Sequence, residues 1–122
     1  MAASKKDHTD SDLSRFDLSG RCILFVGGRK QNIAHLRRVV ESNNGSFAHH
    51  DGGMEESMNR LYSLFQRADA VLFPIDCISH AAQTEVKRLC RRWEKPYLPI
   101  RRHGVSAFSQ ALQQFSLSSS PV

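Results

Sequence analysis

One unbroken apolar segment constrains the fold of this chain more than any other feature. Val71, Leu72, Phe73 and Ile75 follow one another with only Pro74 between them. A strand with one face in water alternates apolar and polar residues, whereas a strand of a parallel sheet, buried on both faces, is apolar throughout. We therefore expect a central strand of a parallel sheet here, with helices covering both faces.

Three further segments have the character of strands, and a helical pattern follows each of the four. Arg21 to Val26 is apolar, Ser46 to His50 is more polar and suits a sheet edge, and Tyr97 to Ile100 is the last. Apolar residues at helical spacing predict the buried faces of four helices. These are Ile33, Leu36, Val39 and Val40; Met58, Leu61, Leu64 and Phe65; Ala82, Val86, Leu89, Cys90 and Trp93; and Val105, Phe108, Leu112 and Phe115.

The alternation predicts an α/β fold, a small flavodoxin-like or Rossmann-like three-layer sandwich. The two most apolar strands belong in the middle of a four-stranded parallel sheet, which gives the order 2-1-3-4. Such sheets bind ligands where the strand order reverses, here between the first and third strands. We expect residues 21–115 to form this single domain. The polar residues 1–20 are expected to be a disordered leader, and residues 116–122 a frayed tail.

Composition narrows the classes of function. The chain has 122 residues, a formal net charge of +5 and three cysteines far apart in the sequence. An odd number of distant cysteines argues against a disulfide framework, and no apolar run is long enough to span a bilayer. Its paired cations fit solvated helix faces. We therefore expect a cytoplasmic protein with no membrane partner, and a basic module for nucleic acid ranks behind the other interpretations.

Groups that can hold a metal follow the central strand. Ser79 has the position of a helix N-cap, which places Cys77 and His80 at a strand-to-helix junction. A helix N-terminus favours the thiolate of a cysteine, and His80 is expected to be exposed because it lies opposite the apolar stripe. Cys-x-x-His supplies two ligands of the kind that zinc or haem iron accepts, but a closed zinc site needs four.

The other ligands are expected at the end of the second strand, where His49, His50 and Asp51 lie. Adjacent histidines on a strand point to opposite faces, so only one of the two can face the crevice and the other is expected to be structural. The same residues of a second chain are an alternative source, and for this reason we expect a homodimer.

Gly27, Gly28, Arg29 and Lys30 follow the first strand and indicate an alternative site. Exposed amides before a helix, together with two cations, suit an anion or a nucleotide. The segment matches neither the dinucleotide-binding pattern nor the Walker pattern. In a haem protein, Arg29 and Lys30, or the pair Arg101–Arg102, would bind the propionates.

No enzyme class fits well. A receiver-like phosphotransfer domain needs an acidic pair where this chain has Gly-Gly-Arg-Lys, and a cysteine phosphatase loop needs an arginine where Gln83 stands. No nucleophile, base and orienting group can be assembled. A binding module is therefore the preferred interpretation, and a thiol enzyme acting through Cys77 stays open.

Five short motifs occur in order along the chain: Val-Gly-Gly-Arg, His-His-Asp-Gly-Gly, Asp-Cys-Ile-Ser-His, Val-Lys-Arg-Leu-Cys and Ser-Ala-Phe. With them the chain resembles, over about residues 21–115, the bacterial family called domain of unknown function 2325, also called a domain related to iron. The resemblance implies a link to haem, zinc or iron, carried mainly by Cys77 and His80. We expect a metal- or haem-binding module that acts in sensing, trafficking or regulation, with a protein partner in regulation or haem trafficking.

Overall fold

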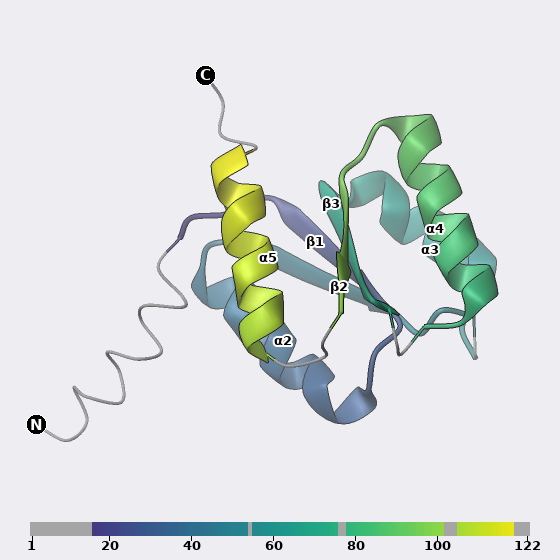
Figure 1. Cartoon of the computed structure of the whole chain (residues 1–122), viewed down its shortest axis with the longest axis horizontal. Coiled ribbons are helices and arrows are strands. Elements are labelled where there is room, and N and C mark those ends of the chain that lie inside the picture. The colour runs from purple at the N-terminus through teal and green to yellow at the C-terminus, as the bar shows by residue number, and fades with distance from the viewer. Residues whose placement is uncertain (1–15, 54, 76–77, 102–104, 119–122) are drawn as a thin grey trace, which may run out of the picture.

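Strands and helices alternate along the whole described part of the chain. The computed structural model describes residues 16–53, 55–75, 78–101 and 105–118. In order, the elements are β1 (Cys22–Val26), α2 (Lys30–Ser42), β2 (Ser46–His50), α3 (Met58–Arg67), β3 (Ala70–Pro74), α4 (His80–Trp93), β4 (Tyr97–Ile100) and α5 (Val105–Ser118). The strands form one parallel sheet in the order β2-β1-β3-β4, which is flavodoxin-like and confirms the expected fold (Figure 1).

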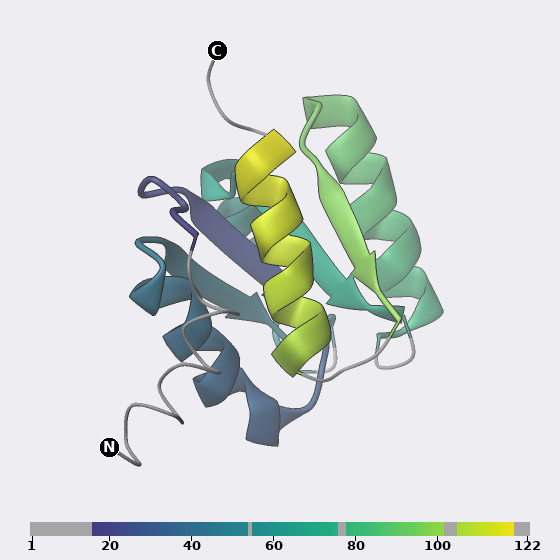
Figure 2. The ribbon, with the colours of Figure 1, turned by 60° about the vertical axis from the view of Figure 1, so that its left-hand side comes forward.

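The sheet lies between two layers of helices, α2 and α5 on one face and α3 and α4 on the other (Figures 1 and 2). Strand β3 shows why its sequence is apolar throughout. Ala70 and Leu72 belong to the core beneath α2 and α5, whereas Val71 and Phe73 belong to the core beneath α3 and α4. All four side chains are fully buried, so a polar residue at any of them would lose its hydration.

Two apolar residues lie elsewhere than expected. Ile75 follows the end of β3 and is 40% exposed, so the apolar segment extends one residue beyond the strand. Trp93 was expected in the buried stripe of α4 but is 54% exposed. The helix ends at this residue, and Glu94 takes a left-handed conformation with a φ of 55°. The indole lines a groove that it shares with Tyr62 and Phe65 of α3.

The packed domain extends beyond both expected boundaries. Leu18 is fully buried, and its N–H donates to the carbonyl of Asn43 (2.8 Å). The N–H of Phe16 donates to the side-chain oxygen of Asn43 (3.2 Å), so residues 16–20 are not part of a disordered leader. At the other end, α5 continues past residue 115, and the buried Ser116 donates to the carbonyl of Gln113 (2.7 Å). The rest of the expected leader and of the expected tail lies outside the described residues.

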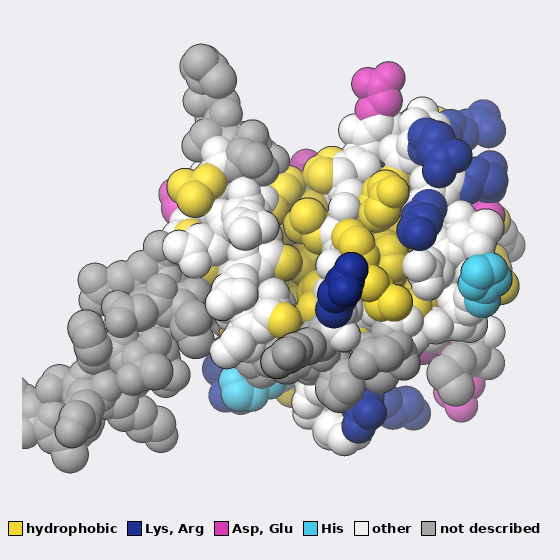
Figure 3. Space-filling model, viewed as in Figure 1, with side chains coloured by type: hydrophobic (Ala, Val, Ile, Leu, Met, Phe, Trp, Pro, Cys, Tyr) yellow, Lys and Arg dark blue, Asp and Glu magenta, His cyan; other side chains and the backbone are white. Residues whose placement is uncertain are grey.

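Strand β4 forms an open edge of the sheet. Hydrophobic side chains gather over it between α5 and α4 (Figure 3). The N–H of Val71 donates to the carbonyl of Pro96 (3.0 Å). The backbone N–H and C=O groups of successive residues in a strand point to opposite sides. The backbone groups of Leu98 therefore point towards β3, and those of Pro99 point towards the open edge. Proline has no N–H to offer there, which protects the edge from pairing with another strand. No described helix combines the length and apolarity that crossing a membrane requires.

Candidate functional site

The turn after β1 depends on two glycines. Gly27 and Gly28 both have a φ of 87°, which residues with a Cβ disfavour. The N–H of Gly27 donates to the carbonyl of His50 (2.8 Å), which joins the ends of β1 and β2. A Cβ on Gly28 would lie 2.5 Å from the ring of Phe25. Arg29, the N-cap of α2, makes no side-chain hydrogen bond to the helix, so the turn presents backbone amides at the positive end of α2.

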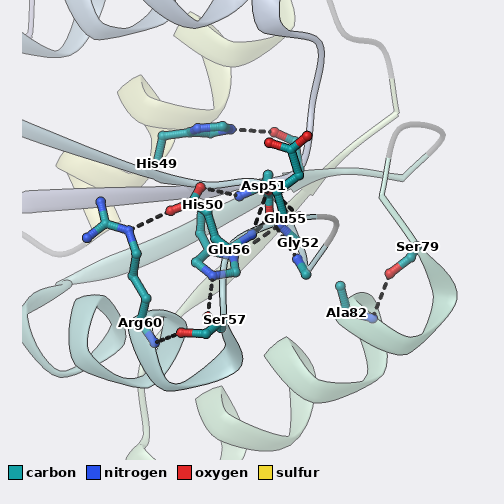
Figure 4. A network of polar contacts seen from close by, with 12 residues as sticks. His49, His50, Asp51, Gly52, Glu55, Glu56, Ser57, Arg60, Ser79 and Ala82 are labelled. Atoms are coloured by element: carbon teal, nitrogen blue, oxygen red, sulfur yellow. Dashed lines mark hydrogen bonds and ion pairs between the residues drawn. The ribbon is translucent and has the colours of Figure 1, made fainter.

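The two histidines at the end of β2 have different roles (Figure 4). Nε2 of His49 lies 2.9 Å from the carbonyl oxygen of Gly27 and therefore carries the proton, which leaves a lone pair on Nδ1. His50 is fully buried. Its Nε2 donates to the carbonyl of Ser57 (2.8 Å), and its Nδ1 accepts from the N–H of Gly52 (3.0 Å). The expectation that one histidine would be structural is confirmed, and that residue is His50.

Asp51 holds together the loop between β2 and α3. Its carboxylate accepts hydrogen bonds from the amides of Gly53 (3.0 Å), Glu55 (2.8 Å) and Glu56 (3.1 Å). Burial raises the pKa of Asp51, but the amide hydrogen bonds outweigh burial and hold the pKa below its ordinary value of 3.8. Glu56 in turn accepts from the N–H of Asp51 (3.0 Å) and from Nε of Arg60 (2.5 Å). The loop is thus fixed by its own acidic residues.

The same loop touches the first turn of α4. A Cβ on Gly52, whose φ is 82°, would lie 3.6 Å from Cβ of Ala82 and 3.9 Å from Cα of Gly27. Ser79 caps α4 as expected, because its hydroxyl accepts from the N–H of Ala82 (3.0 Å). His80, the first residue of this helix, is exposed, which also confirms the expectation. Gly52 therefore lies between the turn after β1 and the start of α4.

A pocket of about 390 Å³ opens where the turn after β1 meets the loop after β2. We call it the edge pocket, because it lies at the carboxyl ends of β1 and β2. Parallel strands bring their carboxyl ends to the same edge of the sheet. The pocket lies between the ends of β1 and β2, one strand away from the crevice expected between β1 and β3. Its lining residues are Gly28, Lys30 and Ile33 on one side and His49, Asp51, Glu55 and Glu56 on the other.

The structure brings together only part of the predicted site. The edge pocket contains Gly28, Lys30, His49 and Asp51, and Gly27 supplies the carbonyl that orients His49. The remaining predicted residues lie outside its lining: Arg29 and Arg101 are exposed, His50 is buried beneath the loop, and His80 is on α4, whereas Cys77 and Arg102 lie outside the described residues.

Sequence reasoning missed Glu55 and Glu56. Both line the edge pocket, although neither lies next to a strand end. The signal was present: the pair directly precedes Ser57, whose side chain accepts from the N–H of Arg60 (3.2 Å) and caps α3. Glu55 and Glu56 therefore belong to the same loop as Asp51, between β2 and α3. Only the path of that loop brings both residues to the turn after β1.

A comparison with protein families shows to which family the chain belongs. The family described as "Uncharacterized protein conserved in bacteria" (DUF2325) matches residues 22–115, from β1 into α5. The chain belongs to this family. The matched span of this DUF2325 protein contains the whole sheet and every lining residue of the edge pocket. A search of curated proteins and a search of solved structures each return no match to the chain.

The residues described for this DUF2325 protein do not form a metal centre. Among them, no three His, Cys, Asp or Glu side chains are grouped so that they could hold a metal ion. His50 uses both ring nitrogens in hydrogen bonds, and the oxygens of Asp51 accept from three amides. Of the three ligands expected at the end of β2, only His49 keeps an unshared nitrogen lone pair. The His49, His50 and Asp51 set does not fit a metal in this arrangement.

Proposed function

We propose that this protein is a cytoplasmic binding module for a small ligand that joins a phosphate to a ribose, as a mononucleotide does. One observation carries the proposal: the edge pocket combines a glycine turn at the start of a helix with carboxylates that follow the adjacent strand. Nucleotide-binding α/β sheets place phosphate at the first of these features and ribose hydroxyls at the second. The edge pocket resembles those sites in the placement of its groups and not in sequence, because its glycines do not match the dinucleotide-binding pattern.

The phosphate belongs at the turn between β1 and α2. Gly28 has no Cβ, so a phosphate can approach the backbone closely, and Lys30 lines the same side of the pocket. The first amides of α2 and its positive end face an anion placed there. Lys30 adds a full charge, so the turn side provides both hydrogen-bond donors and electrostatic attraction.

The ribose belongs at the loop side. Glu55 lines the pocket and is exposed, so its carboxylate can accept hydrogen bonds from vicinal hydroxyls. Nε of Arg60 donates a hydrogen bond to Glu56, and the lowered pKa of Asp51 keeps the Asp51 carboxylate ionised near neutral pH. His49 offers its Nδ1 lone pair to a ligand N–H or O–H, and Ile33 supplies an apolar wall.

Size and charge narrow the ligand further. A volume of about 390 Å³ falls in the range of small-molecule sites. The carboxylates on the loop side repel a ligand that is anionic along its whole length, such as a triphosphate or a nucleic acid strand. A single phosphate at one end with neutral hydroxyls at the other matches both sides. The proposal is therefore a nucleoside monophosphate or a sugar phosphate of similar shape.

Calorimetric titration with AMP tests this proposal. We expect binding of AMP, and weaker binding of adenosine, which lacks the phosphate, and of 2′-deoxyadenosine monophosphate, which lacks one hydroxyl. Lys30→Ala removes the cation at the phosphate and should weaken AMP binding about tenfold or more, since a hydrogen bond to a charged group contributes about 1.5–3 kcal/mol. Glu55→Gln should weaken AMP binding more than adenine binding.

Arg38→Ala is the matched control, because Arg38 is an exposed cation of the same helix outside the pocket lining. It should leave the affinity for AMP unchanged. Absence of heat with AMP and with ribose 5-phosphate at millimolar concentration would overturn the proposal. So would equal affinity losses in Lys30→Ala and Arg38→Ala, because the effect would then come from net charge and not from the pocket.

A second candidate function is metal or haem binding through Cys77 and His80. The observation that favours it is the exposure of His80 at the first position of α4, three residues after Cys77. The remaining ligands would come from a second copy of the chain in a homodimer, or from a protein partner in regulation or haem trafficking. Elemental analysis and an optical spectrum of tag-free protein, before and after haem addition, test it. Loss of the bound metal or Soret band in His80→Ala supports this function, and metal-free protein that ignores haem refutes it.

A further inference from the structure

A groove between α3 and α4 combines a buried apolar floor with exposed aromatic walls. It has a volume of about 240 Å³. Phe65 and Leu89 form its floor and are 2% and 6% exposed. Tyr62 and Trp93 line it and are 36% and 54% exposed. Exposed tryptophan and tyrosine next to an apolar depression are the composition of interface hot spots, so this groove suits an inserted apolar side chain.

The net positive charge of the protein is concentrated on the two helices that form the groove. Their Lys and Arg residues outnumber acidic residues six to one, and the net charge of +5 equals that of the whole chain. Figure 3 shows Lys and Arg side chains gathered along α4. The cations are Arg60, Arg67, Lys87, Arg88, Arg91 and Arg92, and the one carboxylate is Glu85. A field of one sign attracts a partner of opposite sign and orients it during encounter.

The single carboxylate of these helices is already neutralised. Arg88 donates to Glu85 through Nε (3.0 Å) and a terminal nitrogen (2.6 Å), and the hydroxyl of Tyr62 donates to the same carboxylate (2.9 Å). The hydrogen bonds from Arg88 and Tyr62 lower the pKa of Glu85, so the carboxylate stays ionised. Arg92 lies over the ring of Trp93 at 5.8 Å from its centroid. Among the described residues Arg92 has no ion-pair partner, and it is exposed.

We propose that the α3–α4 groove docks an acidic peptide segment of a partner protein. The segment inserts one apolar side chain between Tyr62 and Trp93, onto the floor of Phe65 and Leu89. A carboxylate next to this anchor binds Arg92. The surrounding cations attract the rest of the acidic segment.

The same observations argue against two other occupants. Single-stranded nucleic acid binds by stacking bases on open aromatic faces, but Arg92 covers one face of Trp93. A second copy of the chain would place the same cationic helices opposite each other, and like charges across an interface are unfavourable. An acidic peptide satisfies both the apolar floor and the charge.

Trp93 is the only tryptophan of the chain and reports directly on this groove. The probe is the blocked hexapeptide Asp-Glu-Leu-Phe-Asp-Glu, titrated into the full chain. We expect a saturable change of tryptophan fluorescence that weakens as ionic strength rises from about 0.05 to about 0.3 M. A peptide with serine in place of Leu-Phe should bind about tenfold more weakly, because the anchor is lost.

Arg92→Glu should weaken binding of the hexapeptide about tenfold or more. Arg38→Glu makes the same change of net charge on α2, at the opposite face of the sheet, and should weaken binding less than threefold. Three outcomes would overturn the proposal: no fluorescence response at millimolar peptide, equal losses in the two variants, or equal binding of Lys-Lys-Leu-Phe-Lys-Lys. Tighter binding of oligothymidylate than of the acidic peptide would also overturn it and assign the surface to nucleic acid.

Discussion

Replacing Gly28 by alanine tests the geometry on which the edge pocket depends. The φ of 87° costs an alanine about 1–2 kcal/mol, since this region crowds a Cβ against the backbone. The new Cβ would also lie 2.5 Å from Cε2 of Phe25, far inside van der Waals contact. Relieving such overpacking costs about 1–3 kcal/mol. We therefore expect Gly28→Ala to lower the free energy of unfolding by about 3 kcal/mol.

The ring of Phe25 cannot simply move aside. It packs edge-to-face against Phe108, with centroids 5.5 Å apart and an interplanar angle of 82°. The ring also stacks with His49, with centroids 6.3 Å apart. A shift of Phe25 would therefore disturb both the core beneath α5 and the histidine that lines the edge pocket. We expect Gly28→Ala to weaken AMP binding as well as stability.

Gly20→Ala is the matched control. Gly20 has a φ of 76°, but its Cβ would meet nothing within 4 Å, so only the backbone cost applies. The expected loss for Gly20→Ala is about 1 kcal/mol, because the more restricted unfolded chain offsets part of the strain. Urea unfolding followed by circular dichroism measures both variants. Equal losses in the two would refute the argument, since the contact with Phe25 would then cost nothing.

Three further predictions concern stability and reactivity. Lys95→Met should lower the free energy of unfolding by about 2 kcal/mol in urea titrations, because Nζ of Lys95 donates to three backbone carbonyls at the end of α3 at 2.5–3.0 Å; an unchanged midpoint would contradict this. The lowered pKa of Asp51 contributes stability that is present above its unfolded pKa, about 3.9, and is lost as pH falls through the folded value. The stability advantage of wild type over Asp51→Asn should therefore shrink below about pH 4, and a gap independent of pH would speak against the amide contacts. Burial raises the pKa of Cys90 to about 12, so iodoacetamide near neutral pH should modify Cys90 only in the unfolded chain. Mass spectrometry measures the labelling. If Cys90 of the native protein were labelled as fast as the half-buried Cys22, burial would not protect Cys90.

Local patterns in the sequence were sufficient to predict the sheet. Ala70 to Phe73 must be apolar because both faces of β3 are dry, and the more polar Ser46 to His50 belongs at an edge. Burial of successive residues follows from backbone periodicity, which is visible without coordinates. Leu18 and Trp93 do not follow local patterns: Leu18 is buried by contacts with residues far along the chain, and Trp93 is exposed because its helix ends there.

The candidate site divides in the same way. The sequence by itself determined that glycines, cations and histidines gather at the carboxyl edge of the sheet, because parallel strands all end at that edge. Only the tertiary structure decided that His49 lines the pocket while both ring nitrogens of His50 are used in hydrogen bonds. It also decided that Glu55 and Lys30 line the same pocket. These choices depend on the path of the loop held by Asp51. Contacts of that loop with the turn after β1 leave no periodic trace in the sequence, so no local pattern could predict them.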